Sequence, residues 1–157
     1  MKQGGGRIKG ATFERFVATS ICKAFKVPNK CCYRTPLSGG HPYDSRADLK
    51  IAEPLLSRFP YHVECKHRSD FTCGHLVRPS ASLREWLQKT VRYSGGQRSL
   101  VVVRGNRTPI FALSSRPVAV GVDASFEATI RTDRRRWWVY VLDEFLEAAA
   151  SGRGRNG

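Results

Sequence analysis

The segment Tyr61–His67, with the sequence YHVECKH, carries an acid and a lysine two residues apart in a pattern typical of a short β-strand. Successive side chains of a strand point to opposite faces, so Glu64 and Lys66 share one face while Val63 and Cys65 share the other. A carboxylate and an ammonium group that face the same space can act together on a phosphate ester. Because Glu-x-Lys also occurs by chance on solvated strand faces, the pair needs a second acid before it predicts chemistry.

Asp48 supplies that second acid. It lies in ADLKIA, residues 47–52, where polar and apolar residues alternate as in a strand. Only a short loop separates this segment from residues 61–67, which we expect to return antiparallel beside it and to bring Asp48, Glu64 and Lys66 together. Mg²⁺ prefers oxygen ligands and lowers the pKa of a bound water, and an ammonium group orients that water or offsets developing charge. The three residues therefore predict metal-dependent cleavage of a phosphodiester.

Other acids compete for a place in this site. Glu14 borders the apolar stripe of a helix predicted over residues 11–26, so it can reach the sheet edge; its alternative role is that of a first-turn acid stabilised by the helix dipole. Asp44 and Glu53 lie in loop-like segments close to prolines, so we prefer Asp48 over both.

The charge of the chain indicates a polyanionic partner. Lys and Arg number 27 against 13 Asp and Glu, which gives a formal net charge of +14. Such an excess costs self-repulsion in a compact chain, and nucleic acid is the first candidate partner, ahead of an anionic membrane surface. Lys9 in the N-terminal arm and the run Arg134–Arg136 are the basic positions expected to hold phosphates, although the run is also compatible with a solvated loop.

Length and cysteine content favour a single intracellular domain. The 157 residues suit one domain, expected over residues 10–150, with a flexible basic arm at 1–9 and a disordered basic tail at 151–157. The five cysteines lack CxxC spacing, and the His and Cys residues between 62 and 75 match no common zinc pattern. No apolar run approaches the ~20 residues of a membrane span. We expect a reduced, soluble, cytoplasmic protein that does not bind membranes.

The remaining segments predict a central mixed β-sheet flanked by helices, an α/β (α+β) domain. SLREWLQKTVRYSGG reads as a helix with a capping box at Ser82 and Glu85 and a stop at Gly95–Gly96. SLVVVR is typical of a strand covered on both faces. EPLLSRFP reads as a turn or loop. The other predictions are strands in TPIFAL, PVAVGV and RRRWWVYVL and a terminal helix in DEFLEAAA.

Four short stretches resemble the PD-(D/E)XK nuclease superfamily: KGATFER at 9–15, RTPLSGG at 34–40, ADL at 47–49 and VECK at 63–66. Within it, the chain is most similar to the archaeal-type Holliday junction resolvases, including phage-encoded versions, over about residues 9–103. The resemblance implies a restriction-endonuclease-like fold, a Mg²⁺ cofactor for which Mn²⁺ substitutes, and, for a phage-encoded enzyme, the host cytoplasm.

The resemblance also implies roles for individual residues. Asp48 and Glu64 correspond to the metal-binding carboxylates, Lys66 to the catalytic lysine and Glu14 to the helix acid, with the backbone carbonyl of Cys65 as a further metal ligand. The DNA contacts expected alongside them are Lys9, Arg34, Ser38, Gln88, Arg134, Arg135 and Arg136.

Two classes of function fit these observations. The first is a Mg²⁺-dependent, structure-selective endonuclease that nicks four-way DNA junctions in recombination and repair; two symmetric nicks call for a homodimer. A less selective duplex or flap nuclease would share its active-site residues. The second class is a nucleic-acid-binding module without catalysis, in which Glu64 and Lys66 form only an ion pair.

Overall fold

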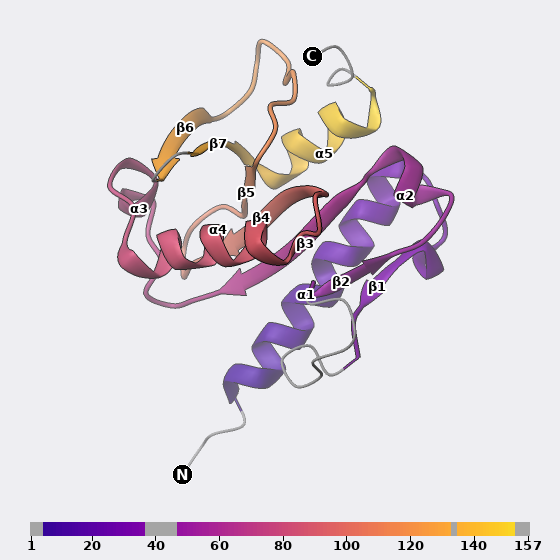
Figure 1. Ribbon diagram of the computed structural model, residues 1–157, viewed down its shortest axis with the longest axis horizontal. Coiled ribbons are helices and arrows are strands. Elements are labelled where there is room, and N and C mark those ends of the chain that lie inside the picture. Colours follow the sequence, from indigo (N-terminus) through magenta and orange to yellow (C-terminus); the bar gives the residue numbers. More distant parts are fainter. Residues whose placement is uncertain (1–4, 37–46, 133–134, 153–157) are drawn as a thin grey trace.

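The computed structural model of the chain describes residues 5–36, 47–132 and 135–152, and its centre is a five-stranded mixed β-sheet (Figure 1). The sheet has the order β3-β4-β5-β7-β6, in which β3 and β4 are parallel and the other neighbours are antiparallel. The strands are β3 (Tyr61–His67), β4 (Arg98–Arg104), β5 (Phe111–Ser114), β6 (Glu127–Thr132) and β7 (Arg135–Val141).

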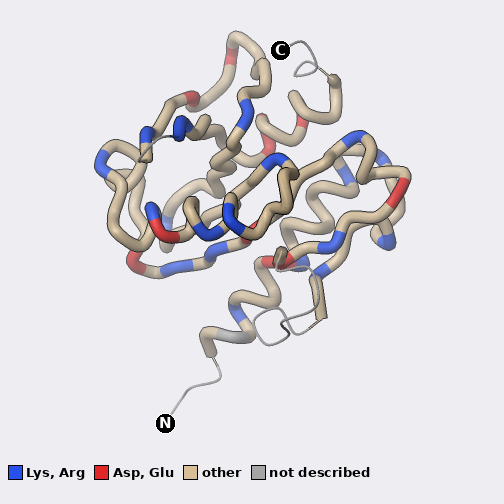
Figure 2. The backbone as a smooth tube through the Cα atoms, in the orientation of Figure 1, with Lys and Arg blue, Asp and Glu red and all other residues tan. Residues whose placement is uncertain are grey.

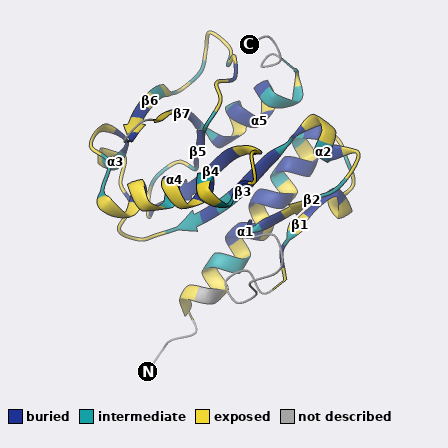
Figure 3. Cartoon of the chain, viewed as in Figure 1, coloured by how far each residue is buried: buried dark blue, intermediate teal, exposed yellow. Residues whose placement is uncertain are grey.

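Helices cover both faces of this sheet (Figure 3). α1 (Gly5–Phe25) and α5 (Leu142–Ala150) bury their apolar residues with Val63 and Val102 in one core cluster. α4 (Ala81–Tyr93) buries Leu83 and Leu87 with Val101 and other residues in a second cluster on the opposite face. The predicted mixed sheet flanked by helices is confirmed.

The helix α4 makes the crossover that parallel pairing of β3 and β4 requires. Its N-terminus is capped by Ser80, whose hydroxyl accepts a hydrogen bond from the backbone N–H of Leu83 at 3.2 Å. The predicted capping box at Ser82 is therefore wrong by two residues. The helix ends where predicted, since Gly95 and Gly96 have φ values of +59° and +86°, a backbone conformation that suits glycine.

A second, two-stranded sheet lies beside the first. β1 (Cys32–Arg34) pairs antiparallel with β2 (Leu49–Ile51), and the predicted antiparallel pairing of β2 with β3 is wrong. The segment between β2 and β3, predicted as a loop, contains the helical turn α2 (Leu55–Arg58). The apolar strand β4 pairs with one edge of β3. On the other edge, Asp48, the residue before β2, hydrogen-bonds to Val63.

The two ends of the chain also differ from expectation. α1 begins at Gly5, six residues before the predicted start, so residues 5–9 of the expected arm are helical.

The segment 117–122 is not a strand, although the sequence predicted one. Both the N–H and the C=O of Val118 bond instead to the hydroxyl of Tyr140. The edge strand β6 was missed because its apolar residues are few. Among the described helices, none is long and apolar enough to cross a membrane.

Three expectations about the C-terminal part are confirmed. β4 is buried along Ser99–Val103, so both of its faces are covered. Trp137 is fully buried and the adjacent Trp138 is half-buried, because neighbouring strand residues face opposite ways. α5 follows β7 as the predicted terminal helix. Two short helices, α3 (Gly74–Val77) and the 3₁₀ turn Asn29–Cys31, complete the described part of the chain.

Gly105, just after β4, packs closely against the backbone of another segment. A Cβ atom added at this position would lie 2.1 Å from the carbonyl oxygen of Phe71. We expect Gly105→Ala to lower the free energy of unfolding by about 1–3 kcal/mol, the usual cost of overpacking. Urea denaturation measures this, with Gly121→Ala as the control because a Cβ there meets nothing within 4 Å. Equal stability of the two variants would contradict the close contact.

Candidate active site

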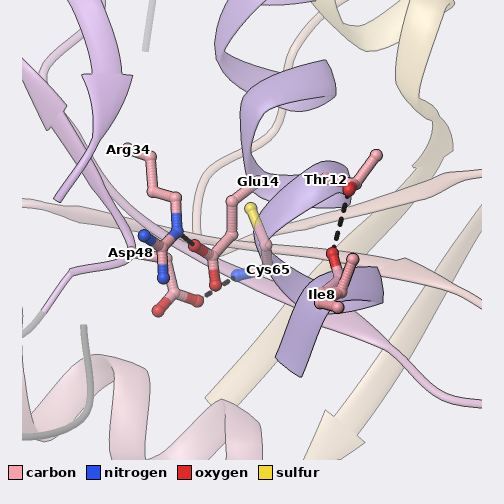
Figure 4. Close-up of polar contacts among 6 residues, drawn as sticks. All are labelled: Ile8, Thr12, Glu14, Arg34, Asp48 and Cys65. Carbon is pink, nitrogen blue, oxygen red and sulfur yellow. Dashed lines mark hydrogen bonds and ion pairs between the residues drawn. The ribbon is translucent and has the colours of Figure 1, made fainter. Parts of the chain in front are cut away.

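Asp48 is held against the free edge of β3 by two hydrogen bonds (Figure 4). Its backbone N–H donates to the carbonyl of Val63 at 3.0 Å, and its carboxylate Oδ2 accepts from the backbone N–H of Cys65 at 2.8 Å. The two bonds use the edge groups that a further strand would otherwise pair. Asp48 therefore lies beside β3, as predicted, although β2 itself pairs with β1.

Glu64 and Lys66 share one face of β3. Lys66 Nζ lies 2.7 Å from Glu64 Oε1. The side chain of Glu64 is 14% exposed and that of Lys66 is 26% exposed. In the sheet they align with Val101 and Val103, which place them on the face that α4 covers, while Cys65 faces the α1 side. The predicted pairing of the two charges on one face is confirmed.

Glu14 reaches the same region from α1. It is buried, and its carboxylate forms an ion pair with the guanidinium of Arg34 at the end of β1. The next residue, Thr35, donates its N–H to the carbonyl of Asp48 at 2.9 Å, so β1 ends directly beside Asp48. Figure 4 shows Glu14 of α1, Arg34 of β1 and Asp48, the residue before β2, lying near Cys65 of β3. The sequence did not identify Arg34 as the partner of Glu14.

The carboxylates of this site repel one another in a poorly solvated space. Burial, followed by the nearby charge of Glu64, raises the pKa of Asp48 to about 7, with a smaller contribution from Glu14. The hydrogen bond from Cys65 and the charge of Lys66 act in the opposite direction. Burial, together with Asp48, Glu14 and Glu64, also raises the pKa of the Cys65 thiol well above its usual value. Glu14 and Glu64 thus both lie within electrostatic range of Asp48.

Lys66 remains positively charged in this setting. Burial alone would lower its pKa, but the charges of Glu64 and Asp48 outweigh burial and raise it. An ammonium group with a raised pKa donates hydrogen bonds and supplies positive charge, and it does not act as a general base near neutral pH. Figure 2 shows acidic positions gathered where α1 and β1 approach β3, in a chain whose Lys and Arg residues are spread over most of the elements.

The oxygen donors of the site fit a hard divalent cation. Glu64 and Asp48 are carboxylates, and burial, followed by the charge of Glu64, raises the pKa of Asp48, so a cation beside them would favour the ionised form. The N–H of Cys65 points to the free edge, and since the N–H and C=O of one strand residue point to the same side, its carbonyl faces that edge too. Among the described residues, no group of three or more His, Cys, Asp or Glu side chains could by itself hold a metal ion. Water and substrate oxygens would therefore have to complete a Mg²⁺ shell.

The remaining predicted residues lie on other elements. Arg135 and Arg136 are exposed on β7, three strands away from β3, and Gln88 is exposed on α4, the helix that covers the Glu64 face of the sheet. Lys9 lies on α1, one turn before Phe13, and is treated below. Ser38, Arg134 and the rival acid Asp44 lie outside the described residues. The second rival, Glu53, accepts hydrogen bonds from Ser57 in the turn of α2, which gives it a structural role.

One buried polar residue was not predicted. His62 shares the strand face of Glu64 and is buried, and its Nε2 atom has no hydrogen-bond partner among the described residues. Burial lowers its pKa, partly offset by the charge of Glu64. The alternation of YHVECKH places His62 on this face, but nothing in the sequence indicated its burial.

Comparison with known proteins gives one match. A family model described as "Phage putative PDDEXK endonuclease" matches residues 5–152. No curated protein and no solved structure matches the chain significantly.

The raised pKa of Asp48 predicts a pH-dependent cost in stability. The folded protein holds this proton more tightly than the unfolded chain, in which the carboxyl has a pKa of 3.8. Ionised Asp48 therefore destabilises the fold. This destabilisation is absent below pH 3.8 and complete above pH 7. At roughly 1.4 kcal/mol per pKa unit, it is on the order of 4 kcal/mol. Asp48→Asn keeps an oxygen that can accept from Cys65. It should therefore stabilise the metal-free protein at pH 8 and much less at pH 4.

The measurement is the free energy of unfolding in urea and EDTA at both pH values. The control is Asp123→Asn, at an exposed position, which should show no such difference between the two pH values. A stabilisation by Asp48→Asn that is the same at pH 4 and pH 8 would contradict the crowding of carboxylates.

Proposed function

The chain belongs to the PD-(D/E)XK nuclease superfamily, in the phage endonuclease family whose model matches residues 5–152, and from this premise we propose that it is a Mg²⁺-dependent DNA endonuclease. The observation that carries the proposal is the convergence of Asp48, Glu64 and Lys66 at the free edge of β3. Asp48 and Glu64 would repel a phosphate unless a cation lies between them and the DNA, and the chain carries a net charge of +14 that suits a nucleic-acid partner.

The residues of the chain have distinct roles in this proposal. Asp48, Glu64 and the Cys65 carbonyl would hold Mg²⁺. When bound, the ion would polarise a phosphoryl oxygen and lower the pKa of a coordinated water. Lys66, kept charged by its neighbours, donates a hydrogen bond and offsets the negative charge that develops during hydrolysis. The Arg34 partner neutralises Glu14, so this acid helps to shape the site with less repulsion toward the substrate.

The alternative of a non-catalytic binding module explains the site less well. A structural ion pair between Glu64 and Lys66 needs no second buried carboxylate. Asp48, however, is fixed by two hydrogen bonds at a position where ionisation is costly. Groups with strongly perturbed pKa values that face a specific charged partner are typical of functional sites.

We expect Asp48→Asn and Glu64→Gln to reduce Mg²⁺-dependent cleavage of DNA by at least ~10²-fold, because each removes a ligand oxygen charge that acts on the transition state. DNA binding should be retained or tighter, since an acid that repels phosphate is gone. Lys66→Ala should lose most of the rate and keep metal binding.

Single-turnover cleavage of labelled DNA measures the rate, and filter binding measures affinity. Glu53→Gln is the matched control, because this acid lies close in sequence but bonds Ser57, and it should leave the rate unchanged. Wild-type turnover by Asp48→Asn or Glu64→Gln would remove that residue from the site.

Within this activity we propose selectivity for four-way junctions and a homodimer, as the resemblance to resolvases implies. Two opposed nicks need two active sites related by a two-fold axis. The apolar strand Trp137–Tyr140 offers little surface for a dimer contact, because Trp137, Val139 and Tyr140 are buried within the protomer. Ile8 and Phe16 instead expose apolar surface on α1.

We therefore expect light scattering to show a dimer that cuts a four-way junction in preference to flap or linear duplex DNA, and only with Mg²⁺. Phe16→Ser should weaken the dimer, and Val122→Ser, at an exposed apolar position elsewhere, should not. A monomer that cuts plain duplex equally well would contradict the junction proposal and leave the endonuclease proposal standing.

A further inference from the structure

A second charged cluster lies at the C-terminal end of β3, just beyond the acid cluster. His67 is the last residue of β3, and its register partner on β4 is Arg104. The Phe13 ring of α1 packs on the imidazole of His67, with ring centroids 5.5 Å apart. Lys9 lies four residues before Phe13 on α1, so the two side chains are neighbours on one helix face. Three elements thus bring Lys9, His67 and Arg104 together.

The basic residues of this cluster are placed by the strand register and by α1. Arg104 aligns with His67, and Lys9 is one helical turn from Phe13, whose ring packs on the imidazole. Arg34 and Lys66, the basic residues of the acid cluster, each form an ion pair with a carboxylate. Among the described residues, neither Lys9 nor Arg104 has such a pair. The cluster therefore presents uncompensated positive charge.

The backbone holds this cluster in place. The N–H of Arg68 donates to the carbonyl of Arg104 at 2.9 Å, which extends the pairing of β3 and β4 past His67. Gly105 then packs against the carbonyl of Phe71. A site built at the end of two paired strands and on a helix is more rigid than one on a loop.

The cluster lies close to the acid cluster along β3. His67 is three residues after Glu64, roughly 10 Å along the strand, and its side chain faces the α1 side, as that of Cys65 does. A phosphate near the cleaved bond would lie at the acids, and a neighbouring phosphate of the same strand would lie at the basic cluster.

We propose that Lys9, His67 and Arg104 form a phosphate-binding subsite that holds the DNA backbone next to the cleaved bond. This inference rests on the proposed nuclease function. The guanidinium of Arg104 can form two parallel hydrogen bonds to phosphate oxygens, Lys9 adds a point charge, and the imidazole of His67 adds a ring N–H donor. The subsite fixes the position of the strand and reads no base sequence.

The first test uses inorganic phosphate and does not depend on nuclease activity. In NMR spectra recorded at constant ionic strength, millimolar phosphate should shift the imidazole signals of His67, which the His67→Gln variant assigns. The double variant Lys9→Gln/Arg104→Gln should lose this response while its thermal unfolding stays unchanged. Signals of His67 that ignore phosphate in the wild-type protein, or that respond equally in the double variant, would overturn the subsite.

The second test uses DNA in EDTA, with fluorescence anisotropy measured as a function of salt. Lys9→Gln and Arg104→Gln should each weaken binding several-fold and reduce the slope of log affinity against log salt by about 1. Arg116→Gln is the matched control, since Arg116 is exposed just after β5, at the opposite end of the sheet from Arg104. Slopes equal to that of Arg116→Gln would overturn the subsite. Mg²⁺-dependent cleavage by the wild-type protein reports separately on the nuclease function.

Discussion

The two hydrogen bonds between Asp48 and the edge of β3 are the constraint on which the site depends. One joins the backbone N–H of Asp48 to Val63, and the other joins its carboxylate to the N–H of Cys65. Together they place an acid from a different sheet beside Glu64 and keep a further strand from pairing with β3 at this point. The burial of Asp48 and its raised pKa follow from this placement, because the carboxylate is held where it meets Glu64 and little water.

The balance of charge at this edge explains how an acidic site works in a basic protein. Glu14, Asp48 and Glu64 supply three negative charges when ionised, and Arg34 and Lys66 supply two positive charges. The sum of these five charges is −1. This charge costs the fold little by repulsion and still attracts a divalent cation. Beyond the acids, uncompensated positive charge at the end of β3 and β4 would suit a phosphate next to the cleaved bond in the proposed subsite.

The sequence predicted the faces on which the charged residues lie better than it predicted the pairing of the strands. Strand alternation placed Glu64 and Lys66 on one face, and the apolar stripe of α1 placed Glu14 toward the sheet. The partner strand of β3 could not be predicted in this way, because β2 is only three residues long and either β1 or β3 could pair with it. The pairing of Arg34 with Glu14 depends on that choice, since it joins residues 20 positions apart. For the same reason the basic cluster at His67 could not be predicted from the sequence, because it forms only when β4 aligns with β3.

In the proposed mechanism Asp48 and Glu64 bind a divalent cation at the edge of β3, and calorimetric titration with Mg²⁺ measures this binding. Because the ion needs ionised Asp48, whose pKa is about 7 in the metal-free protein, binding should weaken as the pH falls below 7, by about tenfold per unit. Asp48→Asn should abolish the binding at every pH. Equal Mg²⁺ affinity in the wild-type protein and in Asp48→Asn, or an affinity that does not change between pH 6 and pH 8, would contradict the claim.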